Sequence, residues 1–234
     1  MTVGEVLISR EIKDHLGDSG VTEVTGWLWA VDCQTCGRPL DSDPPALCVD
    51  DMVAFAAASL HHEECRPPEW GQGPFVGLGN ADHVTHRTRL VMLPVSGENS
   101  PAAIPVMLVN PSMELVILAQ VDGRWHPQFN AAFTGVGMVP PGPQLRLYHP
   151  LSDAAAKLTR TGVTAGMPPA SPTGSYECNI AEGEPFRGAI ADEGGLLLAI
   201  THAVDPFAGD FARQFAAALQ AGLMLFGWIP PSRA

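Results

Sequence analysis

Short runs of Val, Leu and Ile, each bounded by turn residues, dominate the chain after residue 87. Runs of this kind predict strands. The predicted strands are 87–95, 104–109, 114–121 and 144–148, with a further buried strand at 195–201. Asn110-Pro111-Ser112 and Asp122-Gly123 are typical of tight turns, so we expect consecutive strands to pair antiparallel as a meander.

The helical pattern is clearest near the C-terminus. Asp205-Pro206 offers a helix cap and a proline at the first helical position. Phe207, Phe211, Phe215 and Leu219 then recur every four residues and therefore share one helix face. We expect this face to pack on the sheet as part of the core, and a partner-binding face is the alternative.

The rest of the chain has a weaker periodicity. If residues 21–31 are extended, Trp27 and Trp29 lie on the same side of that segment. The remaining expectations are a strand at 45–49, a helix or strand at 52–60, a linker at 67–74, a short helix at 152–161 and a long loop at 162–185.

Four of the five cysteines fall between Cys33 and Cys65. Cys33 and Cys36 form a CxxC pair, and His62 and Cys65 have the same two-residue gap. Zinc prefers four nitrogen or sulfur ligands at tetrahedral corners, and each gap lets one knuckle supply two of them. Gly37 has the backbone freedom that closes the first knuckle. The spacing therefore predicts a zinc site formed by Cys33, Cys36, His62 and Cys65.

This arrangement, C-x2-C-x25-H-x2-C with Gly-Arg-Pro-Leu after the second cysteine, resembles the first half of a LIM domain, a treble-clef-like zinc fold. The resemblance covers residues 33–65 only, and the second zinc half of a LIM domain is absent from the sequence. No family resemblance extends to the rest of the chain.

Two other side chains compete for the fourth ligand position. Cys48 would replace His62 in a four-cysteine site, although a cysteine in an alternating strand can simply face the core. His61 competes because it adjoins His62. With any of these sets we expect a structural metal, because four protein ligands leave no position for a catalytic water.

The net charge of −12 is unevenly placed, because residues 1–75 hold 13 acids against 4 bases, a net charge of −9. A negative field repels phosphate backbones and attracts basic protein patches. We therefore expect a protein partner with a basic surface, and no nucleic acid. Two lysines against eleven arginines are typical of a bacterial genome rich in G and C.

The sequence also bears on localisation. No apolar run approaches the ~18 residues that span a bilayer, and the N-terminus lacks the basic start and apolar run of a signal peptide. We therefore expect a cytoplasmic protein without membrane contact, in which clustered cysteines more often hold metal than form disulfides.

Two weaker groups could carry chemistry. The run Asp82-His83-Val84-Thr85-His86 offers a carboxylate and two imidazoles that could hold a second metal. Cys178, His202 and Asp205 occur in an order that a Cys-His-Asp hydrolase could use, but no local signature marks Cys178 as a nucleophile. No residue is assigned a catalytic role.

These patterns predict an α+β fold with three parts: a small zinc-stabilised module at 1–70, a linker at 71–86, and an antiparallel-sheet domain with a C-terminal helix at 87–234. The favoured function is non-enzymatic: an adaptor, regulator or assembly component acting through protein–protein contacts. The alternatives are a hydrolase or transferase with its site near Cys178 and His202, and a zinc-dependent nucleic-acid binder.

Overall fold

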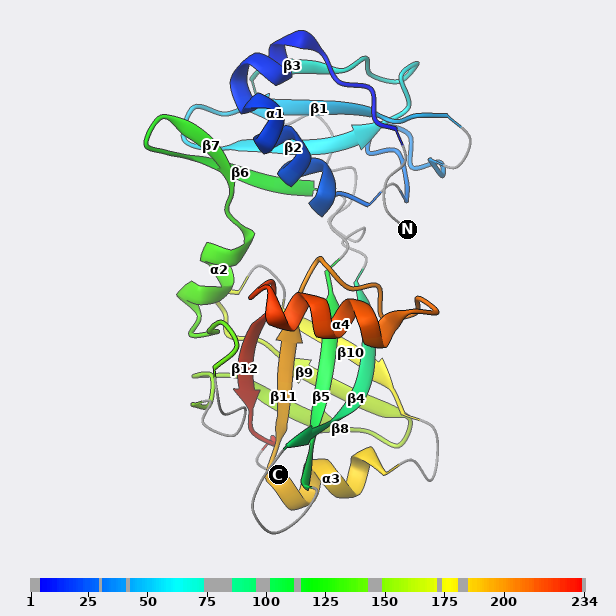
Figure 1. Cartoon of the computed structure of the whole chain (residues 1–234), viewed down its shortest axis with the longest axis vertical. Helices are drawn as coiled ribbons and strands as arrows, with labels where there is room; N and C mark the ends of the chain where they lie inside the picture. Colours follow the sequence, from blue (N-terminus) through cyan, green and yellow to red (C-terminus); the bar gives the residue numbers. More distant parts are fainter. Residues whose placement is uncertain are drawn as a thin grey trace. The chain divides into compact units, whose positions relative to one another are not determined.

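Figure 1 shows the computed structural model of the chain. The structure describes residues 5–29, 31–40, 43–73, 86–95, 102–111, 115–142, 149–171, 174–180 and 185–232. Within these ranges the chain forms four helices and three mostly antiparallel sheets, which confirms the α+β class. The chain divides into two compact units: unit 1 is Met1–Thr85 with Ser112–Phe129, and unit 2 is His86–Pro111 with Asn130–Ala234.

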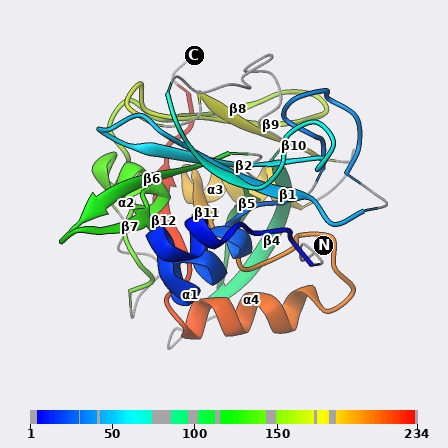
Figure 2. The ribbon, with the colours of Figure 1, turned by 90° about the horizontal axis from the view of Figure 1, so that it is seen from above.

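Unit 1 is built on a five-stranded sheet in the order β3-β1-β2-β6-β7. Its strands are β1 (Ala46–Asp51), β2 (Ala56–His61), β3 (Glu69–Gln72), β6 (Leu115–Val121) and β7 (Arg124–Pro127). All neighbours pair antiparallel except β1 and β3, which are parallel. Helix α1 (Arg10–Trp27) lies along one face of this sheet (Figures 1 and 2).

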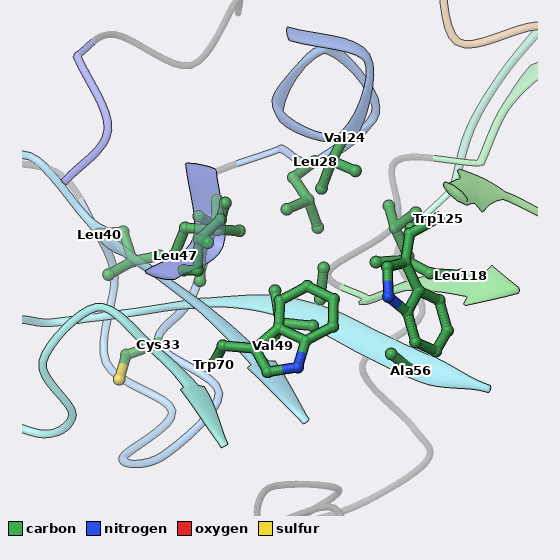
Figure 3. Close-up of a cluster of buried hydrophobic side chains, with 14 residues drawn as sticks. Val24, Leu28, Cys33, Leu40, Leu47, Val49, Ala56, Trp70, Leu118 and Trp125 are labelled. Atoms are coloured by element: carbon green, nitrogen blue, oxygen red, sulfur yellow. The ribbon is translucent and has the colours of Figure 1, made fainter. Parts of the chain in front are cut away.

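Residues 21–27 belong to helix α1, so the extended arrangement that would put Trp27 and Trp29 on the same side is not formed. Ser9 caps the helix, because its hydroxyl accepts a hydrogen bond from the Ile12 N–H at 3.2 Å. Gly17 has φ 67° and interrupts the helix with a kink, which hid the helical pattern in the sequence. Ile12, Val24 and Leu28 are nevertheless buried against the sheet, and this packing outweighs a sequence of low helical propensity (Figure 3).

The other expectations for the N-terminal part have mixed outcomes. The strand at 45–49 is confirmed as β1. For residues 52–60, where a helix or a strand was possible, the structure has a strand, β2. The linker at 67–74 is wrong over 69–72, where β3 pairs with β1 and buries Trp70. A strand pairing therefore outweighs the nearby Gly and Pro. Residues 74–85, which include Asp82 and His83, lie outside the described residues.

The expected meander is confirmed for one pair and wrong for the next. Strands β4 (Arg87–Val95) and β5 (Ala102–Asn110) pair antiparallel. Residues 115–121, however, form β6 and pair with β2 and β7 in the unit 1 sheet, whereas the sequence predicts them within the 87–234 domain. The physical reason is burial, since Val116 and Leu118 complete the core under α1.

Unit 2 holds a four-stranded sheet in the order β12-β11-β5-β4 and a three-stranded sheet in the order β10-β9-β8. Its other elements are α2 (Phe129–Gly135), β8 (Ala155–Leu158), β9 (Gly162–Gly166), β10 (Ser175–Asn179), α3 (Phe186–Glu193), β11 (Leu196–Ile200), α4 (Phe211–Gln220) and β12 (Leu225–Ile229). Helix α4 lies over one face of the four-stranded sheet, and the three-stranded sheet lies over the other (Figures 1 and 2).

Two expectations for this unit are corrected. The short helix at 152–161 and the loop at 162–185 are wrong where β8, β9 and β10 form a sheet. Gly162 is the reason that a glycine-rich run can be a strand here, because a Cβ at this position would meet the Cys178 carbonyl oxygen at 2.6 Å. The strand at 195–201 is confirmed as β11. The strand at 144–148 lies outside the described residues.

The C-terminal helix is present but begins later than expected. Phe211, Phe215 and Leu219 pack on the core, whereas Phe207 is 67% exposed and precedes the helix. Asp205 is not a helix cap, because its carboxylate accepts the Phe207 N–H within a separate turn. The expectation that this apolar face packs on the core is therefore confirmed for three of its four residues.

Candidate metal centre

The structure brings together one side-chain cluster that could hold a metal ion. The ligand atoms of Cys33, Cys36, His62 and Cys65 all lie within 4.8 Å of one another. Among the described residues, this is the one group of three or more Cys, His, Asp or Glu side chains with such spacing. Two separate knuckles supply the four atoms, as the sequence spacing predicts.

The first knuckle is the loop that carries Cys33 and Cys36. The Cys33 N–H donates to the Arg38 carbonyl at 2.8 Å, and the Gly37 N–H donates to the Cys33 carbonyl at 2.8 Å. Gly37 has φ 69°, a left-handed conformation that glycine adopts without steric cost. The turn thus directs both sulfur atoms to the same side of the loop.

The second knuckle directly follows β2. The N–H groups of Cys65 and Arg66 both donate to the His62 carbonyl at 3.0 Å, which closes a tight turn. The two knuckles are joined by backbone contacts, since the Gln34 N–H donates to the Leu60 carbonyl at 3.1 Å. The His62 N–H also lies 3.3 Å from the Cys33 sulfur. These bonds help to hold the four ligand atoms close together.

The His62 ring is oriented for coordination. Its Nε2 lies 3.0 Å from the Pro39 carbonyl oxygen, which can only accept a hydrogen bond, so this nitrogen carries the proton. The unprotonated Nδ1 then faces the Cys36 sulfur at 3.4 Å and the Cys65 sulfur at 3.9 Å. Bond lengths to zinc of ~2.3 Å for sulfur and ~2.0 Å for nitrogen give a tetrahedral S···N edge of about 3.5 Å. The observed distances therefore fit this metal.

The electrostatics of the cluster also favour a cation. Hydrogen bonds from the backbone and the guanidinium of Arg38 lower the pKa of Cys36 to about 6. Burial and the neighbouring Cys36 and Cys33 thiols raise the pKa of Cys65 to about 11. Partial burial opposes a charge on His62, but the Pro39 carbonyl and the sulfurs raise its pKa. Adjacent thiolates repel one another, and a divalent ion would relieve that repulsion.

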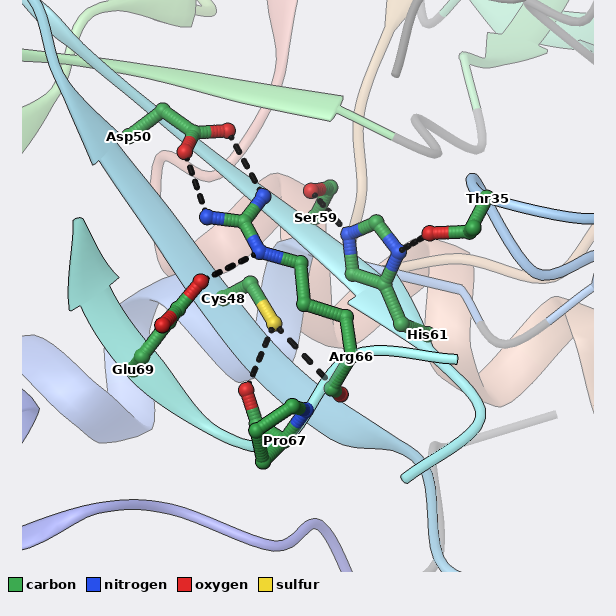
Figure 4. Close-up of polar contacts among 8 residues, drawn as sticks. All are labelled: Thr35, Cys48, Asp50, Ser59, His61, Arg66, Pro67 and Glu69. Carbon is green, nitrogen blue, oxygen red and sulfur yellow. Dashed lines mark hydrogen bonds and ion pairs between the residues drawn. The ribbon is translucent and has the colours of Figure 1, made fainter. Parts of the chain in front are cut away.

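The alternative ligands lie elsewhere (Figure 4). Cys48 is buried, and its thiol donates to the Pro67 carbonyl at 3.3 Å; burial raises the pKa of this thiol to about 12. His61 is also buried, with its ring nitrogens 2.8 Å from the hydroxyls of Thr35 and Ser59. Burial, reinforced by the charge of Arg66, lowers the pKa of His61 to about 4. Neither side chain belongs to the four-residue cluster.

Sequence reasoning missed a buried ion pair beside this site (Figure 4). The Arg66 guanidinium donates to both carboxylate oxygens of Asp50 and, through Nε, to Glu69 at 2.7 Å. The Asp50 and Arg66 side chains are only 5% and 12% exposed. These contacts raise the pKa of Arg66, chiefly through Asp50. The adjacency of Arg66 to the ligand Cys65 links the second knuckle to β1 and β3.

The three hydrolase candidates of unit 2 have different surroundings among the described residues. Cys178 lies on β10 and lines a groove of about 740 Å³ together with His86 and Glu177, and His202 is not among the described lining residues. The ring nitrogens of His202 are covered, and this burial lowers its pKa to about 3. Asp205 pairs with Arg87 at 3.3 Å.

No family model, no curated protein and no solved structure matches the chain, so the LIM-like resemblance of residues 33–65 stays a prediction. None of the described helices is long and apolar enough to cross a membrane.

Proposed function

We propose that the chain is a non-enzymatic, zinc-binding protein that acts as an adaptor, regulator or assembly component through protein–protein contacts in the cytoplasm. The observation that carries the proposal is the Cys33, Cys36, His62 and Cys65 cluster, whose four ligand atoms lie within 4.8 Å of one another. Around a zinc ion these atoms would supply all four corners of a tetrahedral site. Such a closed site has no position for a substrate or a catalytic water, so its metal is structural. A treble-clef-like arrangement of the two knuckles is part of the proposal.

The charge distribution supports a basic protein partner. Unit 1 contains 16 acidic and 5 basic side chains, a net charge of −11, whereas unit 2 contains 9 acidic and 8 basic ones, a net charge of −1. Nearly the whole negative charge of the protein therefore belongs to the unit that carries the metal cluster. Such a field accelerates association with basic protein surfaces and opposes contact with nucleic acid.

A salt-dependence experiment tests this function. We expect the full-length protein to capture a protein partner at low ionic strength and to release it as salt rises, because screening weakens the attraction to unit 1. In a gel-shift assay at physiological salt, the same protein should leave duplex DNA and RNA unbound. Sub-micromolar, salt-sensitive DNA binding would contradict the proposal, and so would a partner that ignores salt and docks on unit 2 alone.

The groove around Cys178 supports a second candidate, a hydrolase or transferase. Cys178, His86 and Glu177 line the same groove, so a thiol, an imidazole and a carboxylate share one surface of unit 2. Rapid alkylation of Cys178 by iodoacetamide, lost on replacement of His202 or His86, would favour this candidate. Alkylation no faster than that of an ordinary thiol would favour the adaptor.

A further inference from the structure

Unit 1 also contains a recess, which lies at the end of its sheet remote from the metal cluster. It has a volume of about 670 Å³, and its lining includes Asp51, Val53, Gln72, Gln120 and Trp125. These residues come from the carboxyl ends of β1, β3 and β6, the β1–β2 turn and the start of β7. The metal cluster follows the opposite end of β2. The six residues of this strand span about 17 Å at ~3.3 Å per residue, which separates the recess from the metal cluster. We call this recess the Asp51 pocket.

The rim of the Asp51 pocket contains a residue that the fold alone does not explain. Val53 has φ 72°, a conformation that β-branched residues rarely adopt, and it is 94% exposed. Its N–H donates to the Asp51 carboxylate at 2.8 Å. Phe55 in the same turn and Val121 at the end of β6 are also exposed. Glycine would relieve the strain, so the apolar side chain gives no benefit to the isolated protein.

Asp51 provides a directed negative charge inside this apolar rim. One of its oxygens accepts the Val53 N–H, and the other accepts the Trp70 indole N–H at 3.3 Å. These bonds fix the carboxylate, yet a carboxylate has about four acceptor positions, so capacity remains. In the described part of the chain no lysine or arginine pairs with Asp51, in contrast to Asp50, which Arg66 neutralises.

We propose that the Asp51 pocket binds an arginine side chain from a basic segment of the protein partner. This inference rests on the adaptor function and names the surface that would carry it. A guanidinium is planar, pairs with a carboxylate through two hydrogen bonds and lies favourably against an indole such as that of Trp125. The amides of Gln72 and Gln120 offer further acceptors.

The rim and the charge of unit 1 define the rest of the partner. The exposed side chains of Val53, Phe55 and Val121 would contact apolar residues that flank the arginine. The net charge of −11 on unit 1 would attract the basic segment before contact. Apolar residues interspersed with arginine therefore describe the partner segment.

Fluorescence anisotropy with a short labelled peptide of alternating Arg and Leu tests the pocket on the zinc-loaded full-length protein. We expect wild type to bind this peptide, to bind a matched Lys/Leu peptide more weakly because an ammonium cannot pair through a planar fork, and to ignore a Glu/Leu peptide. Asp51→Asn should weaken Arg/Leu binding about tenfold or more, because a charge-assisted contact is lost.

Asp18→Asn is the matched control, because it removes the same charge from an exposed position on α1. It should change the affinity by less than about twofold. Val53→Gly is a second test variant, which keeps the proposal testable if Asp51→Asn does not fold. This variant should raise the melting temperature by about 2–4 °C, because strain is removed, and still weaken peptide binding several-fold.

Three results would overturn the pocket. The first is an equal effect of Asp18→Asn and Asp51→Asn, which would mean that only the diffuse field attracts the peptide. The second is full binding by Val53→Gly. The third is no binding of the Arg/Leu peptide by wild type. If salt-sensitive capture of a protein partner persists in any of these cases, the adaptor function stands and only the pocket is wrong. If that capture is also absent, the adaptor function itself has failed.

Discussion

Removal of zinc by a chelator should unfold the knuckles and the adjoining part of unit 1 while the core of unit 2 stays folded. Metal binding contributes ~10–16 kcal/mol in zinc-finger peptides, which is comparable with the stability of a whole domain. Cys33 is buried and belongs to the core cluster of unit 1 (Figure 3). Loss of the metal would therefore leave adjacent thiolates, which repel one another, beside that core. We therefore expect segment 32–66 to lose its order.

Hydrogen exchange with and without chelator measures this effect. Amides of β1 and β2 should lose protection, whereas those of β5 and β11 should keep it, because α4 and its sheet form a separate core. Cys33→Ser/Cys36→Ser should behave like the chelated wild type, and Cys48→Ala should respond to chelator as wild type does. Uniform loss of protection in unit 2, or an unchanged unit 1, would contradict the structural role of the metal.

Arg66→Met should destabilise unit 1 by about 3–5 kcal/mol, because it leaves the Asp50 carboxylate buried without its cation. The double variant Asp50→Asn/Arg66→Met should recover much of this loss, since no buried charge remains unpaired. Chemical denaturation of the zinc-loaded protein measures both values, followed through the fluorescence of Trp70 and Trp125, which belong to the core of unit 1.

Arg10→Met is the matched control for this prediction. Arg10 and Asp14 form an exposed ion pair on α1, with 3.8 Å between the charged atoms, so its loss should cost less than about 1 kcal/mol. Equal effects of Arg10→Met and Arg66→Met would show that burial does not determine the strength of the Asp50 pair. A double variant as unstable as Arg66→Met would show that Arg66 acts through packing and not through charge.

The metal cluster could be predicted because its information is local. Cys33 and Cys36 lie in one turn, His62 and Cys65 lie in another, and each gap of two residues reports the geometry of its own knuckle. The matched gaps also favour His62 over His61 in the sequence, but the surroundings of His61 are known only from the structure. Adjacent residues of a strand end point to opposite sides, and only the fold shows that the hydroxyls of Thr35 and Ser59 flank His61.

The pairing of β6 with β2 could not be predicted, because it joins residues about sixty positions apart and is fixed by burial of Val116 and Leu118. Strand β9 could not be predicted either, because its glycine-rich sequence is typical of a loop. Gly162 instead lets the backbone of β10 approach closely at Cys178. Charged residues such as Asp50 and Arg66 are usually solvated, so the sequence alone favours the surface for them. Their pairing depends on β1, β3 and the second knuckle meeting in space.

X-ray absorption at the zinc edge of the purified full-length protein tests the central claim most directly. We predict about one zinc per chain, with three sulfur ligands at ~2.3 Å and one nitrogen ligand at ~2.0 Å, from Cys33, Cys36, Cys65 and His62. A shell of four sulfur atoms would show that Cys48 replaces His62. An oxygen-containing shell would indicate an open and potentially catalytic site, and a folded protein without bound metal would contradict the structural zinc altogether.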